Sequence, residues 1–441
     1  MDTTTSTRAA PAVGATLGGR RAPTDRRAPA PGTMETPRRP PLALLVAMMA
    51  SSQLAITIYL PSLPFMPAAL ATTQAMVQLV LTLYLAAFAA AQLFVGPLSD
   101  AFGRRRVLVS GLGLFTLASV LAAAAPRIEV LLAARVLQAM GACAAIVVSR
   151  AIIRDTSSGR AAARSMAYLG MSMAVAPAVA PVIGGQLQVL FGWRANFAVI
   201  AIVSALVWLA VHLTLRETLP VADRRPARLA TLVRTYAALG GMRTFMGYSL
   251  TVAALTAGFH SFLAAAPIVL ILLLGISPEL YGVYTLTVPL GFMAGNFVSS
   301  RVTQRMGVDR PIWLGNVLAV SATLVLVAVS VAGVQDVAII LAPIVVLAFA
   351  NGMALPNCLA GALSAVQPNM AGSASALGGS LQMLSGTVAT LVIAVLVHTS
   401  SLQLALVLAT TAILSFVFFA ALTNGAFGAP ARAESSVEAG D

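Results

Sequence analysis

Four charged residues lie within one eleven-residue segment, GPLSDAFGRRR (Gly96 to Arg106), whose long flanking sequences contain no charge. A carboxylate beside guanidinium groups forms charge-assisted hydrogen bonds, and the glycines that bracket Asp100 permit a tight turn. Basic residues that only keep a loop on the cytoplasmic side would need no fixed spacing. The pattern G-x3-D-x2-G-R-R-R therefore indicates a specific ionic contact made by Asp100 and three consecutive arginines, Arg104, Arg105 and Arg106.

Two other groups could do chemistry inside apolar segments. Arg135 and Gln138 are three residues apart, so a helix places them on one face where they could share a partner. A cation at the centre of a membrane span costs roughly 2.5–3.5 kcal/mol on insertion scales, unless Arg135 reaches the outer interface. His260 has the intrinsic pKa of a proton carrier, although a lone histidine of this kind can equally be a hydrogen-bonded packing residue.

The elements that must position these residues are apolar helices. The 441 residues are 59% hydrophobic and only 9% charged, which is too few polar side chains to cover a soluble globule. Apolar stretches of about 20 residues recur without the alternation of a β-barrel. We predict an all-α polytopic membrane protein with twelve transmembrane helices, near 42–61, 76–96, 107–125, 130–150, 164–187, 196–214, 244–266, 280–300, 311–332, 337–358, 372–396 and 402–422.

The basic residues predict the orientation. The chain has a net charge of +13 and contains no lysine, and all but three of its 27 basic residues lie in alternate connecting segments. The exceptions are Arg127, Arg135 and Arg194. The positive-inside rule then places both termini in the cytoplasm and the protein in the inner (plasma) membrane. A charge spread over loops in this way does not indicate nucleic-acid binding.

The longest polar interruption divides the spans six and six. We predict two six-helix halves with the substrate site at the midplane between them, as in many secondary transporters. A weaker copy of the charged loop, GNFVSSRVTQRMGVDR, aligns Gly307 with Gly103 but places Gln304 at the position of Asp100. The predicted parts are a disordered cytoplasmic tail (1–41), the first half (42–214), a basic cytoplasmic linker (215–243), the second half (244–422) and a cytoplasmic tail (423–441).

The charged loop resembles the loop signature of the major facilitator superfamily. The matching positions are Gly96, Leu98, Asp100, Gly103, Arg104, Arg105 and Leu108. The resemblance implies the major facilitator fold and a cytoplasmic gate in which the aspartate contacts basic residues and a helix N-terminus of the other half. We place Arg106 and Arg154 in the same gate.

Further stretches resemble one branch, the Bcr/CflA-type drug-resistance exporters. ITIYLPSLPFMPAAL carries the Y-L-P-x-x-P motif from Tyr59, and Arg135 with Gln138 matches R-x-x-Q-G with Ala139 in place of glycine. SMAVAPAVAPVIGGQL resembles the antiporter motif, with Pro177, Pro181, Gly184 and Gly185. The resemblance implies antibiotic efflux by alternating access, exchange for protons, and a monomer.

One departure from that branch bears on coupling. An acid commonly stands two residues before Y-L-P, where this chain has Thr57, and none of its 14 acidic residues lies deep in a predicted span. Arg135 therefore has no intramembrane counter-ion. We expect neutral or weakly acidic, amphenicol-like compounds to be favoured over cations, and we expect protons, if they move, to use His260, Asp100 or Asp155.

The remaining polar residues yield cavity candidates and no enzyme. Tyr59, Tyr84 and Gln382 are the first choices for lining the substrate cavity. No catalytic group, cofactor motif or metal cluster is found, and Cys143 and Cys358 fall inside spans as small apolar residues. Export of an endogenous metabolite or self-made antibiotic, and import or facilitated diffusion of a small solute on the same fold, remain open.

Overall fold

The computed structural model describes residues 40–224, 229–367, 370–396 and 400–423. Within these ranges the ordered elements are all helical, so the all-α prediction is confirmed. Nearly all of the two predicted tails, 1–41 and 423–441, lies outside the described residues.

The helices follow the predicted spans closely. The elements of the first half are α1 (Leu42–Thr57), η1 (Leu60–Phe65), α2 (Met66–Ala69), α3 (Gln74–Phe102), α4 (Arg104–Ala123), α5 (Ile128–Thr156), α6 (Gly159–Phe191) and α7 (Trp193–Thr214). The segment between the halves holds η2 (Val221–Asp223) and α8 (Leu229–Gly240). The second half comprises α9 (Arg243–Pro267), η3 (Ile268–Leu273), α10 (Pro278–Met306), α11 (Asp309–Val331), α12 (Val337–Ser364), α13 (Ala371–Leu396) and α14 (Ser401–Leu422).

Eleven helices of the described chain are long and apolar enough to cross a membrane. The predicted eighth span, 280–300, falls on α10, which has 29 residues and ample length. Its composition is more polar, with Glu279, Arg301 and Arg305 near its ends and several Thr, Ser and Gly residues between them. The twelfth crossing therefore stays a prediction.

Proline shapes two spans differently. α1 ends at Thr57, and Pro61 and Pro64 lie in the short 3-10 segment that follows, because proline cannot donate to a helical hydrogen bond. In contrast, α6 runs unbroken for 33 residues through Pro177 and Pro181. Neighbouring helices and local adjustment allow proline inside a membrane helix.

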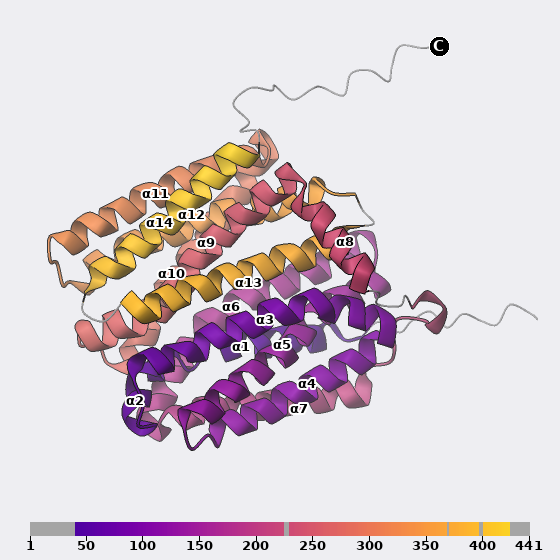
Figure 1. Cartoon of the computed structure of the whole chain (residues 1–441), viewed down its shortest axis with the longest axis horizontal. Coiled ribbons are helices and arrows are strands. Elements are labelled where there is room, and N and C mark those ends of the chain that lie inside the picture. The colour runs from indigo at the N-terminus through magenta and orange to yellow at the C-terminus, as the bar shows by residue number, and fades with distance from the viewer. Residues whose placement is uncertain (1–39, 225–228, 368–369, 397–399, 424–441) are drawn as a thin grey trace, which may run out of the picture. The chain divides into compact units, whose positions relative to one another are not determined.

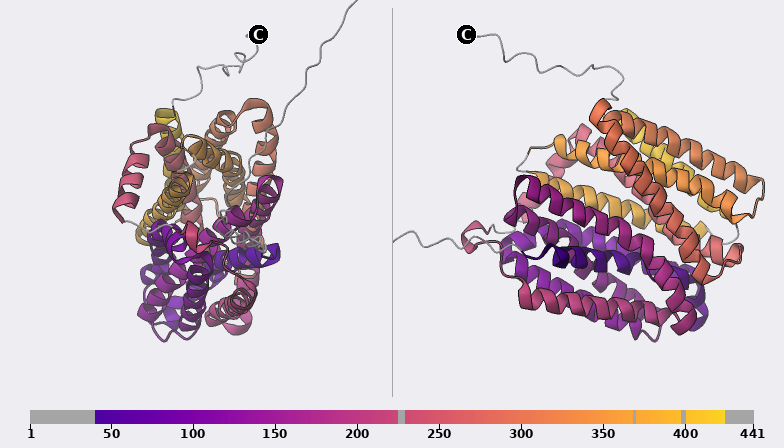
Figure 2. Two further views of the ribbon diagram at one scale, coloured as in Figure 1. Left: turned by 90° about the vertical axis from the view of Figure 1, so that its right-hand side faces the viewer. Right: turned by 180° about the vertical axis from the view of Figure 1, so that it is seen from behind.

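Two pairs of helices join the halves: α3 lies beside α13, and α6 lies beside α10 (Figures 1 and 2). The α3–α13 contact carries hydrogen bonds between Thr82 Oγ1 and Thr390 Oγ1 (2.9 Å) and from Ser380 Oγ to the Ala89 carbonyl (2.9 Å). The ion pairs found among the described residues all lie within the first half and the segment after it. The hydrogen bonds at the α3–α13 contact thus join neutral groups, and none of the ion pairs found in the described chain crosses between the halves.

Glycines of α6 allow close backbone contacts at the α6–α10 pair. A Cβ added at Gly184 would overlap the carbonyl of Ile58, and one at Gly185 would overlap the carbonyl of Pro278. The end of α6 therefore lies against the segment after α1 on one side and the start of α10 on the other. Only glycine permits this closeness, as in other tightly packed membrane helices.

Gly184→Ala tests this closeness. The added methyl group cannot fit against the Ile58 carbonyl, so we expect the substitution to destabilise the protein by about 1–3 kcal/mol, as overpacking does. A lower midpoint of thermal unfolding of the purified protein measures the effect. Gly170→Ala is the matched control on the same helix, because a Cβ there meets no heavy atom of the described chain within 4 Å; an equal loss in both variants would contradict the interpretation.

Candidate transport site

Arg135 lies at the centre of a hydrogen-bonded cluster in the first half. Its side chain, on α5, is fully buried at 0% exposure. Nε donates to the Val80 carbonyl of α3 (3.2 Å), and Nη1 donates to the Ala55 carbonyl of α1 (2.9 Å) and to Gln138 Oε1. Nη2 donates to the Tyr59 hydroxyl (3.3 Å). Four donations thus satisfy most of the guanidinium.

Aromatic rings complete the surroundings of this cation. The guanidinium carbon lies 4.2 Å from the ring centre of Tyr84 and 4.6 Å from that of Tyr59. Ring faces carry negative potential and attract a desolvated cation. Carbonyl oxygens, an amide and two rings therefore balance Arg135 without the carboxylate that the sequence lacks.

The cluster extends to a fourth helix. Gln138 Nε2 donates to Ser119 Oγ of α4 (2.8 Å), and Ser119 Oγ donates to the Phe115 carbonyl (2.6 Å). The R-x-x-Q pair thus ties together α1, α3, α4 and α5. Thr57, the cavity candidate at the position where the related exporters carry an acid, is also buried, and its hydroxyl has no partner among the described residues.

The structure separates the other two predicted cavity residues from this cluster. His260 of α9 is buried, and its Nδ1 lies 2.8 Å from the Thr256 carbonyl, so Nδ1 carries the hydrogen. A Cβ at Gly386 of α13 would lie 2.7 Å from the same nitrogen. Gln382, one turn earlier on α13, is partly buried. The predicted residues thus form two groups, one in the first half and one at the α9–α13 contact.

The charged loop binds within its own half. Arg104 pairs with Asp100 (2.5 Å) and donates through Nε to Asp155 at the end of α5 (2.8 Å). The Asp100 side chain is 48% exposed and has no ion pair with the second half among the described residues. Gly103 adopts φ +97°, and Gly307, its counterpart in the weaker copy, adopts φ +75°. Both copies therefore turn on a glycine in the left-handed region.

Sequence reasoning missed the role of Glu217 at this loop. Its Oε1 accepts a hydrogen bond from the backbone N–H of Arg104, the first residue of α4 (2.9 Å). A carboxylate there satisfies a free N–H and favours the positive end of the helix. Arg105 donates to the carbonyls of Leu215 and His212 at the end of α7. The resemblance implies that Asp100 contacts a helix N-terminus of the other half; here Glu217, just after the first half, makes such a contact with α4 of the first half. Its position just after a predicted span was the only available signal.

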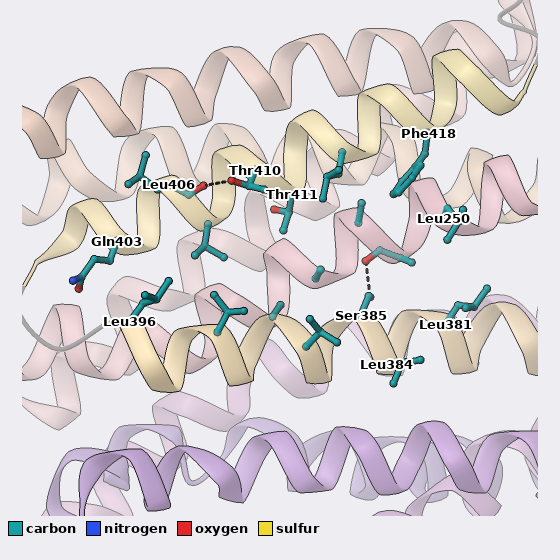
Figure 3. A pocket seen from close by; sticks show the side chains of 18 residues that line it. Leu250, Leu381, Leu384, Ser385, Leu396, Gln403, Leu406, Thr410, Thr411 and Phe418 are labelled. Carbon is teal, nitrogen blue, oxygen red and sulfur yellow. Dashed lines mark hydrogen bonds between the residues drawn. The ribbon is translucent and has the colours of Figure 1, made fainter.

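A separate apolar groove of about 710 Å³ lies between α9, α13 and α14 (Figure 3). Its hydroxyl groups are already satisfied: Ser385 donates to the Ala253 carbonyl (2.7 Å) and Thr410 to the Leu406 carbonyl (2.8 Å). The lining contains no charged residue, and none of the predicted cavity residues lines it. The groove suits an apolar group.

Comparison with known proteins identifies the family. The sequence pattern of the Major Facilitator Superfamily matches residues 45–390. The chain belongs to this superfamily. It is 34% identical over 390 residues to the Bacillus subtilis (strain 168) protein named Uncharacterized MFS-type transporter YdgK, covering 88% of this chain and 96% of the relative. It is 32% identical over 352 residues to Multidrug resistance protein D of Escherichia coli (strain K12), covering 79% and 87%. Chloramphenicol resistance protein of Pseudomonas aeruginosa is 31% identical over 354 residues, covering 78% and 81%.

Solved structures agree on the fold. The crystal structure of D-xylose-proton symporter matches with a TM-score of 0.69 and 15% identity, covering 87% of this chain and 98% of that one. The human organic anion transporter MFSD10 matches with a TM-score of 0.64 and 16% identity, covering 86% and 97%. The major facilitator fold predicted from the charged loop is confirmed. The protein is a multi-pass membrane transporter of this superfamily and not an enzyme.

The Arg135 cluster makes a testable distinction between two residues. Arg135→Gln removes the guanidinium donor of the buried Gln138 Oε1, and an unsatisfied buried group costs roughly 1–3 kcal/mol. Tyr84→Phe removes a buried hydroxyl that has no described partner and keeps the ring over the cation, so we expect it to be neutral or slightly stabilising. Thermal unfolding of the purified variants measures both. Equal destabilisation by the two substitutions would contradict the interpretation that the hydrogen bonds of Arg135 stabilise the fold and the Tyr84 hydroxyl does not.

Proposed function

We propose that this protein exports drug-like small molecules from the cytoplasm by alternating access. The contact between the halves supports this: its described hydrogen bonds join neutral groups and its glycines bring backbones together, whereas the described ion pairs lie within the first half and the segment after it. Such a contact can rearrange without separating buried charges. The names of the relatives, multidrug and chloramphenicol resistance, support a drug as the cargo.

The topology is part of the proposal. We propose twelve crossings in two halves, 42–214 and 244–422, from the apolar stretches of the sequence. The arginine distribution supports a cytoplasmic position for the basic linker and both termini. On this orientation the Glu217–Arg104 contact lies at the cytoplasmic side and the Gly184–Ile58 contact at the outer side. We assign the protein to the inner (plasma) membrane, as a monomer.

We propose neutral or weakly acidic substrates, with amphenicol-like compounds favoured. The acidic residues of the described helices lie at or near helix ends, such as Asp155, Glu279 and Asp309, so the interior offers no carboxylate to a cationic drug. The apolar groove likewise offers only neutral, satisfied groups. A cation would lose its hydration in such surroundings without gaining a counter-charge.

Expression in a pump-deleted host tests the export proposal. We expect higher resistance to chloramphenicol and no change for ethidium, with faster loss of preloaded chloramphenicol from energised cells. An importer or a facilitator of a small solute would instead raise accumulation or leave resistance unchanged. Failure across the whole drug panel would favour an endogenous metabolite or a self-made antibiotic as the cargo.

We propose His260 as the proton carrier of an antiport cycle. Its Nδ1–H is held by the Thr256 carbonyl, which leaves Nε2 as the site for a second proton, and α13 packs against the ring. In proteoliposomes, drug-driven proton movement should disappear in His260→Asn while drug binding persists. His212→Asn is the control, because His212 lies in the last turn of α7. Unchanged coupling in His260→Asn would transfer the role to Asp100 or Asp155.

A further inference from the structure

Three arginines on or beside α5 differ in what balances their charge. Arg104 pairs with Asp100 and Asp155, and Arg135 lies among carbonyls and rings. The third, Arg150, makes one hydrogen bond to another described residue, from Nη2 to the Met173 sulfur of α6 (3.2 Å). A thioether is a weak acceptor. Within the described residues no carboxylate pairs with Arg150.

Arg150 lies inside a helix, although the predicted span 130–150 ends at this residue. α5 continues to Thr156, and α6 begins at Gly159. The guanidinium thus branches from the backbone about 9 Å before the helix end. The side chain is partly buried. A cation held within a membrane-spanning helix is costly unless a partner or water compensates it.

The neighbouring contacts show which way this face of α5 points. Arg154 follows one turn later on the same face, and its Nη1 lies 3.9 Å from a Cβ built at Gly372, in the first turn of α13 in the second half. Val147, one turn before Arg150, lies 3.9 Å from a Cβ built at Gly96 of α3. α3 and α13 are themselves in contact. The face that carries both arginines is therefore directed to the contact between the halves.

Two guanidinium groups one turn apart repel each other. Arg154 is exposed and has no ion pair in the described part of the chain. An anion placed between the two would relieve the repulsion and supply the missing partner. Arginine is suited to this because its planar fork binds a carboxylate through two parallel hydrogen bonds.

We propose that Arg150 and Arg154 bind the carboxylate of an amphiphilic weak acid that the protein transports. The proposal rests on the export function above and narrows its substrate class from neutral or weakly acidic compounds to include a monoanion with an apolar body. The anion meets the arginines at the end of α5, and the apolar body lies toward the contact between α3 and α13.

Equilibrium binding to the purified full-length protein in detergent tests this, with fusidic acid as the carboxylate probe and chloramphenicol as the neutral probe. We expect Arg150→Gln to weaken fusidate binding about tenfold or more, equivalent to 1.4 kcal/mol, and to leave chloramphenicol binding unchanged. Arg150→Lys should give an intermediate loss, because it keeps the charge without the fork. Arg160→Gln, at an exposed position two residues into α6, is the control for charge alone and should change neither.

Several outcomes would overturn the proposal. One is unchanged fusidate affinity in Arg150→Gln, and another is an equal loss for both probes. If Arg150→Gln does not fold, Arg154→Gln removes the exposed partner and must weaken fusidate binding in the same selective way. Added phosphatidylglycerol should not displace fusidate; displacement in the wild type but not in Arg150→Gln would assign the arginines to a lipid phosphate instead. Fusidate binding without export of any drug from cells would refute the export function and leave the anion site standing.

Discussion

The structure depends on the cost of leaving a polar group unsatisfied where no water can reach it. Arg135 meets this constraint in its most demanding form, because it is a fully buried cation in a chain with no deep carboxylate. Its solution uses groups from several helices: carbonyls of α1 and α3, Gln138 beside it on α5, and through Gln138 a serine of α4. This set of hydrogen bonds therefore ties α1, α3, α4 and α5 to one another.

The contact between the halves is of a different kind. Hydrogen bonds such as Thr82 to Thr390 average about 0.6 kcal/mol in membrane proteins, and the glycines of α6 contribute close packing without charge. Strong bonds within a half and weak bonds between halves are what rigid-body rocking around a central site requires. The loop at Gly103 follows the same division, because Glu217 and Asp155 hold it to the first half.

Much of this was predictable where the signal is local. Long apolar runs gave the helices, the charged loop and the Gly184–Gly185 pair gave the family, and the positive φ of Gly103 follows from its place in a turn. The bonds of Glu217 and Arg135 were not predictable, because their partners lie far away in sequence and include backbone carbonyls that carry no sequence signature. The continuation of α5 beyond Arg150 to Thr156 was missed because a charge near a span end looks the same in a loop and in a last helical turn. The predicted eighth span falls on α10, which is long enough to cross a membrane but too polar to be counted among the eleven apolar helices.

The arrangement of positive charge also bears on how a substrate could favour closure. With no carboxylate deep in its helices, the protein can balance an arginine only with backbone, rings, a residue at a helix end, or a ligand. Arg135 is balanced by backbone carbonyls and aromatic rings, and Arg104 by acidic residues at helix ends. In the described structure, neither Arg150 nor Arg154 has a partner of any of these kinds. While empty, this pair is best kept in contact with water, since enclosing two unpaired cations between the halves is costly. A bound anion removes that cost. It therefore binds more strongly when the halves enclose the two arginines than when the arginines face water. A ligand shifts the equilibrium between two conformations only through such a difference in affinity. Substrate charge and conformational change would then be linked through α5, without a titrating acid in the membrane.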